Sequence, residues 1–112
     1  MAVRRTVGSL LKAYRHINGI STDVICKIGR FSKSTIAKLE SCSYHNVGAE
    51  DSQDAVSVNV CEKIAKCMQM KLSEFFQLVE EIEQEKEDER NSITYLKVAE
   101  YLLKKKRNNE KS

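Results

Sequence analysis

One short segment of the chain holds the side chains whose types and spacing point most directly to chemistry. Lys33, Ser34, Ala37 and Lys38 take the outward positions of a helix that is expected to begin after Ser32. All four are small, hydroxylic or basic, whereas an ordinary solvated helix face mixes both signs of charge. Small side chains permit close approach, and hydroxyls and cations donate hydrogen bonds to phosphates and base edges. This row predicts a surface that contacts nucleic acid.

The other reactive side chains form no recognisable site. No two cysteines have C-x-x-C spacing, and neither histidine completes a set of metal ligands with them. The residues concerned are Cys26, Cys42, Cys61, Cys67, His16 and His45. A Ser-His-Asp arrangement, paired carboxylates and a phosphate-binding loop are not evident. We therefore expect no enzyme activity, no metal and no cofactor, and reduced thiols in a cytoplasmic protein, because nothing indicates secretion.

The charge is distributed unevenly along the 112 residues, whose formal net charge is +3. Residues 1–49 hold eight basic and two acidic side chains, whereas residues 50–112 hold eleven basic and fourteen acidic ones. A basic front half suggests a face directed at a polyanion. The longest stretch without charged side chains is short and polar, so neither a signal peptide nor a membrane span is expected.

The elements that must position the basic row are predicted to be helices, because the chain has no proline and only four glycines. Apolar spacing predicts a first helix over roughly residues 7–17, with Ile17 among its inward residues. Ser21 is the expected N-cap of a second helix whose apolar face is Val24, Ile25 and Ile28. Ser32 is expected to cap the third helix.

The second half has a weaker pattern. Residues 41–57 form a long polar loop, and the alternating valines that follow fit either a strand or a fourth helix from about Val58, which we favour. Ser73 is the expected cap of a fifth helix. Residues 80–89 are strongly acidic and are predicted to extend the fifth helix. Asn91-Ser92 is expected to interrupt the helix and to start a last amphipathic helix.

The segment from Ser21 to Glu40 resembles the helix-turn-helix of the Cro and phage-repressor family, also called the XRE family. The motif needs a small residue where its helices cross, an apolar residue after the turn and two inward apolar residues on its second helix. Those positions hold Cys26, Phe31, Ile36 and Leu39. The resemblance also covers residues 10–15, 58–68 and 70–76, and thus spans roughly residues 7–79.

The chain departs from the family pattern at three places. The family usually has glycine in the turn where this chain has Arg30, with its own glycine one residue earlier at Gly29. Cys26 stands where the family usually has alanine. The loop over residues 41–57 is longer than usual, which affects the expected start of the fourth helix.

The resemblance implies an all-α fold with two parts. Residues 1–79 would be a five-helix lambda-repressor-like helix-turn-helix domain, and residues 80–112 an acidic linker helix followed by a C-terminal amphipathic helix. The DNA-binding residues that it implies are Thr22, Ser32, Lys33, Ser34, Ala37, Lys38, Ser43 and Tyr44. Lys33 and Ser34 would contact base edges, Ala37 a thymine methyl, and the others mainly phosphate. Charge and position make Arg4 and Arg5 either an arm on the DNA or a disordered tail.

Two functions from different classes follow. The first is a sequence-specific double-stranded DNA-binding regulator, a repressor acting as a homodimer on a two-fold operator. The second is a protein-interaction module on the same fold, an antitoxin or an adaptor that binds a protein partner through the C-terminal helix. The predicted dimerisation residues are Ile93, Leu96, Leu102 and Leu103. The same helix is equally compatible with folding back on its own domain.

Overall fold

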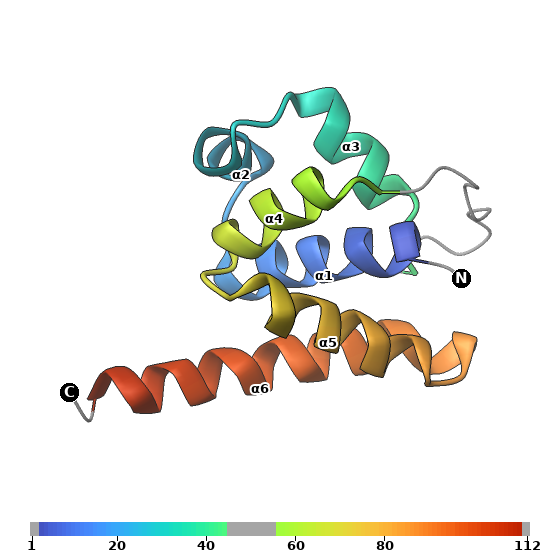
Figure 1. The fold of residues 1–112 in the computed structure, drawn as a ribbon, viewed down its shortest axis with the longest axis vertical. Coiled ribbons are helices and arrows are strands. Elements are labelled where there is room, and N and C mark those ends of the chain that lie inside the picture. Colours follow the sequence, from blue (N-terminus) through green and yellow to red (C-terminus); the bar gives the residue numbers. More distant parts are fainter. Residues whose placement is uncertain (1–2, 45–55, 111–112) are drawn as a thin grey trace.

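The computed structural model describes residues 3–44 and 56–110, which form six α-helices and one turn of 3₁₀ helix without any strand (Figure 1). The elements are α1 (Val3–Asn18), α2 (Thr22–Gly29), α3 (Lys33–Ser41), α4 (Val58–Cys67), α5 (Leu72–Glu83), η1 (Glu87–Glu89) and α6 (Arg90–Glu110). The predicted all-α class is confirmed. None of the described helices combines the length and the apolar composition needed to cross a membrane.

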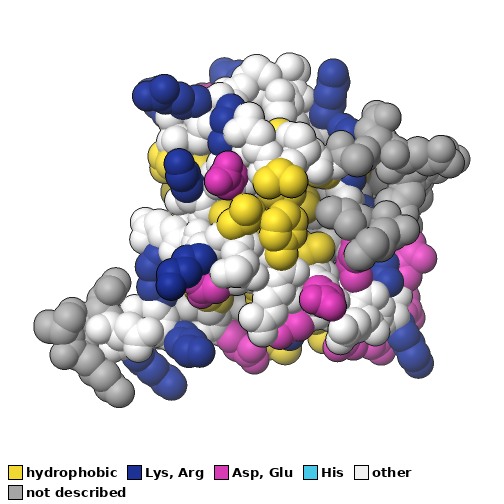
Figure 2. Space-filling model, viewed as in Figure 1, with side chains coloured by type: hydrophobic (Ala, Val, Ile, Leu, Met, Phe, Trp, Pro, Cys, Tyr) yellow, Lys and Arg dark blue, Asp and Glu magenta, His cyan; other side chains and the backbone are white. Residues whose placement is uncertain are grey.

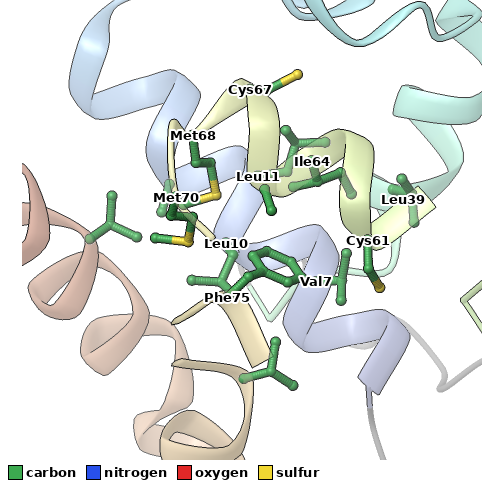
Figure 3. Packing of buried hydrophobic residues seen from close by; sticks show 14 of the residues in the cluster. Val7, Leu10, Leu11, Leu39, Cys61, Ile64, Cys67, Met68, Met70 and Phe75 are labelled. Atoms are coloured by element: carbon green, nitrogen blue, oxygen red, sulfur yellow. The ribbon is translucent and has the colours of Figure 1, made fainter. Parts of the chain in front are cut away.

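Helix α1 is the centre of the packing, because α3, α5 and α6 all lie against it, and α4 closes the core between α2 and α5 (Figure 1). Val7 and Leu10 of α1 are fully buried beside Phe75 of α5, and Ile64 and Met68 reach the same cluster from α4 or its end (Figure 3). Burying such side chains contributes roughly 1.5–3 kcal/mol each. The core thus holds α3 in place through α1.

Serine caps set the starts of three helices. The Ser21 hydroxyl accepts from the Val24 amide at 3.4 Å and the Ser32 hydroxyl from the Thr35 amide at 3.2 Å, which confirms both predicted caps. Ser57 caps α4 in the same way, so the helix from Val58 is confirmed and the competing strand is not formed. Each such bond satisfies an amide that the helix itself leaves unpaired.

The second half of the chain differs from the prediction at both expected boundaries. Helix α5 begins at Leu72, and the Lys71 amide donates to the Glu74 carboxylate at 3.3 Å, so the predicted cap at Ser73 is wrong. The acidic segment does not simply extend α5, since the helix ends at Glu83. The guanidinium of Arg90 donates to the carbonyl oxygens of Glu83 and Glu85, which stabilises this earlier break. The predicted break at Asn91-Ser92 lies inside α6.

The buried faces of α2 and of the end of α1 include fewer apolar residues than predicted. Of the three residues predicted to form the apolar face of α2, only Ile25 is buried, whereas Val24 is 38% and Ile28 57% exposed. Ile17, at the end of α1, is 40% exposed. The eight-residue α2 has room for a single row against α4, so apolar residues beside that row remain on the surface.

Helix α3 crosses α1 at a glycine. A Cβ on the buried Gly8 would collide with the backbone carbonyl of Leu39, so the two helices approach at this point more closely than any side chain allows. Nearby, the Arg15 guanidinium makes two hydrogen bonds to the Glu40 carboxylate, at 2.8 and 3.1 Å. This bidentate pair helps to fix the direction of α3 relative to α1. It also raises the pKa of Arg15.

Helix α6 folds back along α1 and α5 (Figure 1). Its inward row includes Thr94 and Val98, both fully buried. The Tyr101 hydroxyl and the Lys105 ammonium donate to the Gln69 carbonyl, which anchors the helix further along. The alternative that α6 packs on its own domain is therefore the one that the structure has.

Candidate nucleic-acid interface

Helices α2 and α3 are joined by residues 30–32, and the turn depends on two neighbouring residues with different tasks. Arg30 takes the left-handed conformation, with φ 56° and ψ 46°, and ends α2. Gly29 is still helical, but a Cβ there would lie 2.5 Å from the Phe31 ring and 2.9 Å from the Cys67 sulfur. Glycine is thus required by close packing, whereas the position that favours glycine by its backbone angles holds an arginine.

The apolar positions of the expected motif are placed as predicted. Ile36 is fully buried and Leu39 is 4% exposed, and both belong to the main core. Phe31 and Cys26 are half-buried and pack against the same core. These four side chains therefore hold α2 and α3 to the domain and leave the opposite side of α3 to the surface.

That opposite side is the predicted row of small and basic residues. Lys33, Ser34, Ala37 and Lys38 are all exposed. The only acidic residue of α3, Glu40, is turned inward to Arg15. The exposed row, which we call the α3 row, therefore has the two cations and the hydroxyl without a carboxylate among them, as an anionic partner requires.

One acidic residue of the neighbouring helix does reach the α3 row. The Lys33 ammonium lies 3.0 Å from the Asp23 carboxylate, in a pair whose side chains are 77% and 58% exposed. The hydrogen bond and the charge of Asp23 raise the pKa of Lys33. An exposed pair of this kind is worth little in stability. Lys33 can therefore exchange Asp23 for a guanine edge or a phosphate at small cost.

The hydroxyl residues of the predicted site divide into two roles. Ser32 uses its hydroxyl as the cap of α3, and that oxygen also lies 3.1 Å from the Ser34 hydroxyl and 2.8 Å from that of Thr35. Ser32 thus orients its neighbours. Thr22, the half-buried first residue of α2, lies at a helix N-terminus, where unpaired amides favour an anion.

The predicted phosphate contacts in the segment after α3 are wrong. Ser43 is fully buried and Tyr44 is 7% exposed. The Tyr44 hydroxyl accepts from the Arg90 guanidinium at 2.9 Å. The guanidinium groups of Arg5 and Arg90 lie 4.6 and 5.6 Å from the centre of its ring. Sequence patterns could not reveal this, because both arginines are distant along the chain. The rest of the long loop, residues 45–55, lies outside the described residues.

Arg4 and Arg5 do not form an extended arm or a tail, because both belong to the first turns of α1. The Arg5 guanidinium donates to the Glu87 carboxylate at 3.0 Å and covers the Tyr44 ring. Arg4 lines a groove of about 240 Å³ together with Lys38 of the α3 row. The arm prediction is wrong because the helix begins at Val3, four residues earlier than its apolar spacing indicates.

A second group of cations lies together in the structure although the sequence patterns did not indicate it. Arg30, Lys63 and Lys66 line an open groove of about 350 Å³ between the end of α2 and α4. The Lys63 ammonium also lies 5.5 Å from the centre of the Phe31 ring. The spacing of the two lysines, three positions apart on one helix, is the signal that would have indicated a shared face.

Acidic side chains are unevenly placed on the face that Figure 2 shows. Most of them lie low in this view, over α5 and its surroundings, whereas lysine and arginine side chains lie both over α2 and α3 and near the C-terminal end of α6. Only three acidic residues belong to the first four helices, namely Asp23, Glu40 and Glu62. The α3 row therefore stands in the basic part of the described surface.

The four predicted dimerisation residues divide between two sides of α6. Ile93 and Leu102 are half-buried and pack against the core of their own chain. Leu96 and Leu103 remain 54% and 59% exposed. Two of the four predicted residues, Leu96 and Leu103, thus remain at the surface of the chain.

Comparisons with known proteins add no relative to this picture: no family model matches the chain, and no match is found among curated proteins or among solved structures.

Proposed function

We propose that the protein is a sequence-specific DNA-binding regulator with the lambda-repressor-like helix-turn-helix fold, a cytoplasmic repressor that binds a two-fold operator as a homodimer. The observation that carries the proposal is the α3 row. A short helix projects two cations, one hydroxyl and one methyl group outward, while its apolar residues and its only carboxylate face inward. Such a helix fits the major groove, which is about 12 Å wide.

The roles of the residues follow from their places on the surface. Lys33 and Ser34 lie at the N-terminus of α3, which is the end that contacts base edges when such a helix enters the groove. Ala37, one turn further, suits a thymine methyl, and Lys38 a phosphate. Thr22 at the start of α2 is a second phosphate contact. Arg15 and Glu40 act indirectly, by holding α3 against α1.

A protein-interaction module is the second candidate. It is favoured by the exposed Leu96 and Leu103 of α6. An antitoxin or adaptor of this kind would bind its protein partner through α6. Its function would not require the α3 row to contact DNA bases. Enzyme activity is not part of either proposal.

Selection of bound duplexes from a random DNA pool, at a stated salt concentration, tests the first proposal. We expect enrichment of an inverted repeat whose half-sites are centred about one helical turn apart. On that sequence Lys33→Ala should weaken binding by roughly 5- to 150-fold and relax one base position, because a good base contact is worth about 1–3 kcal/mol.

The matched control is Lys86→Ala, which removes the same charge from an exposed position beside η1. It should change affinity by less than about twofold, because interactions beyond a Debye length of roughly 8–10 Å are screened. Failure to enrich any sequence, or equal losses for Lys33→Ala and Lys86→Ala, would contradict base recognition by α3. Weak binding that only follows the salt concentration would favour the second candidate.

A further inference from the structure

The groove between the end of α2 and α4 is lined mostly by cations. Arg30, which ends α2, and Lys63 and Lys66 of α4 border an open space of about 350 Å³, together with Ile28 and Gly29. We call this space the turn groove. Neither Arg30 nor the two lysines form an ion pair with a residue that the structure describes. Their charge is therefore available to an anionic partner.

The wall of the turn groove depends on the packing at Gly29. Because glycine has no side chain, the Phe31 ring packs directly against it, and a Cβ there would lie 2.5 Å from the ring. The Lys63 ammonium in turn lies 5.5 Å from the centre of this ring. A contact of this kind stabilises a cation by about 0.5–1 kcal/mol. It holds Lys63 between α4 and the residues that lead into α3.

Negative charge near the turn groove does not cancel its cations. The groove lies at the C-terminal ends of α2 and α4, and each such end carries about half a negative charge. Exposed Glu62, next to Lys63 on α4, adds one more. Against these stand Arg30, Lys63 and Lys66, and also Lys27 in the last turn of α2. An excess of about two positive charges remains, which is more than the two helix ends require.

The turn groove lies beside the end of α3 that is proposed to contact bases (Figure 1). Arg30 comes three residues before Lys33, so their backbones are at most roughly 11 Å apart. The acidic residue of α2, Asp23, belongs to the opposite end of that helix and pairs with Lys33. A duplex that contacts the α3 row therefore passes close to the turn groove.

The length of α2 also suits two contacts with the DNA backbone. Its eight residues measure roughly 12 Å, which is about the width of the major groove. The first helix of a helix-turn-helix crosses the backbone while the second lies in the groove. Thr22 at the start of α2 and Arg30 at its end are thus spaced to meet the two strands that border the groove.

We propose that the turn groove binds backbone phosphates of the duplex that the α3 row contacts, on the strand next to the N-terminal end of α3. The inference rests on the proposed function and adds Arg30, Lys63 and Lys66 to its site. The planar Arg30 guanidinium donates two parallel hydrogen bonds to phosphate oxygens, whereas the lysines act as point charges. Such contacts fix how a protein lies on the duplex and carry no sequence information.

The salt dependence of DNA binding tests the inference. Fluorescence anisotropy measures the affinity of the full chain, at several salt concentrations, for two duplexes of unrelated sequence, one of them the operator if selection yields one. Replacing all three cations by glutamine should make the slope of log affinity against log salt shallower by about 2–3 on both duplexes, because each neutralised phosphate contributes roughly 0.9. Base preference should not change. The variant combines Arg30→Gln, Lys63→Gln and Lys66→Gln.

Three further variants separate charge from folding. A charge-matched control changes exposed lysines on the far side of α1 from α3 and should leave the slope unchanged (Figure 1). It combines Lys86→Gln, Lys104→Gln and Lys106→Gln. A charge-retaining variant should keep the slope, and it combines Arg30→Lys, Lys63→Arg and Lys66→Arg. Lys66→Gln alone, at an exposed position, should give a slope shallower by about 0.9 even if the triple variant is less stable.

The outcomes distinguish this inference from the proposed function. If the glutamine variants leave the slope unchanged, or if the charge-matched control lowers it equally, the inference is overturned while base recognition by α3 stands, and an acidic protein segment becomes the better occupant of the groove. A shallower slope in a chain that enriches no DNA sequence would support the turn groove and contradict sequence-specific binding. A chain that retains no DNA at low salt would overturn both.

Discussion

At the scale of single residues, the turn between α2 and α3 has two requirements that different residues meet. One residue must take a left-handed backbone conformation, and its neighbour must leave room for close packing. A left-handed residue other than glycine, asparagine or aspartate is uncommon, yet Arg30 takes that conformation while Gly29 is helical. The reason lies in packing: only Gly29 leaves room for the Phe31 ring and the Cys67 sulfur. Glycine at position 29 is therefore a packing requirement, and Arg30 bears the backbone strain.

Substitutions at these two positions should have opposite signs. Arg30→Gly should raise the free energy of unfolding by about 0.5–1 kcal/mol, because it relieves the left-handed conformation. Gly29→Ala should lower it by about 1–3 kcal/mol, because the added methyl group overlaps a ring and a sulfur. Urea unfolding followed by circular dichroism measures both. Stabilisation by Gly29→Ala, as helix propensity alone predicts, would show that packing does not require this glycine.

Tyr44 illustrates why exposure cannot be inferred from a polar neighbourhood. It stands in a hydrophilic stretch and looks available to phosphate, but it is 7% exposed and two guanidinium groups pack against its ring. Its hydroxyl lies between the Arg90 guanidinium, at 2.9 Å, and the Thr6 hydroxyl, at 3.3 Å. Tyr44 thereby joins the segment after α3 to the first turn of α6 and to α1.

At the scale of elements, the position of the α3 row depends on how closely α3 approaches α1. The approach is possible because Gly8 presents only a hydrogen atom to the backbone of Leu39. Unlike a flexible side chain, that carbonyl cannot move without shifting the end of α3. The Arg15–Glu40 pair then determines the orientation of the helix.

Gly8→Ala should therefore cost stability although alanine is the better helix former. We expect a loss of about 1–3 kcal/mol, because overpacking a rigid contact outweighs a propensity gain of about 1 kcal/mol. DNA affinity should fall as well, since α3 must shift. Thermal unfolding and a DNA titration measure the two effects. Ser73→Ala, at an exposed helical position of α5, is the control and should be close to neutral; an unchanged stability in Gly8→Ala would disprove the close contact.

At the scale of the whole molecule, burial of weak acids in the core links stability to alkaline pH. Burial raises the pKa of the Cys61 and Cys67 thiols, and it also raises the pKa of the Tyr14, Tyr95 and Tyr101 phenols. In the unfolded chain these groups lose their protons at lower pH than in the folded one. The stability that they provide is therefore fully present below their unfolded pKa values and is lost as the pH rises through the folded ones.

The melting temperature should accordingly change little between about pH 7 and pH 8 and decrease between about pH 9 and pH 11. Thermal unfolding by circular dichroism across this range measures it. In a Cys61→Ala, Cys67→Ala variant, compared with its own value at pH 7, the decrease should be smaller and should begin at higher pH, because the phenols are the buried weak acids that remain. A flat profile to about pH 11 would contradict the burial of these groups.

Local patterns were enough to predict the all-α class, the caps at Ser21 and Ser32, the start of α4 near Val58 and the inward direction of Ile36 and Leu39. All of these depend on residues within one turn or on apolar periodicity, which the order of amino acids contains directly. The outward direction of Lys33 and Ser34 follows from the same periodicity, whereas their binding of DNA stays a prediction.

Contacts between distant segments decided the rest. The burial of Tyr44 needs Arg5 and Arg90, the end of α5 at Glu83 needs Arg90, and the turn at Gly29 needs Cys67 of another helix. The burial of Val98 and the exposure of Leu96 and Leu103 have the same origin, because apolar residues lie on both sides of α6 and only packing selects one side. Periodicity shows which side chains share a face, whereas the fold determines which face meets a neighbour.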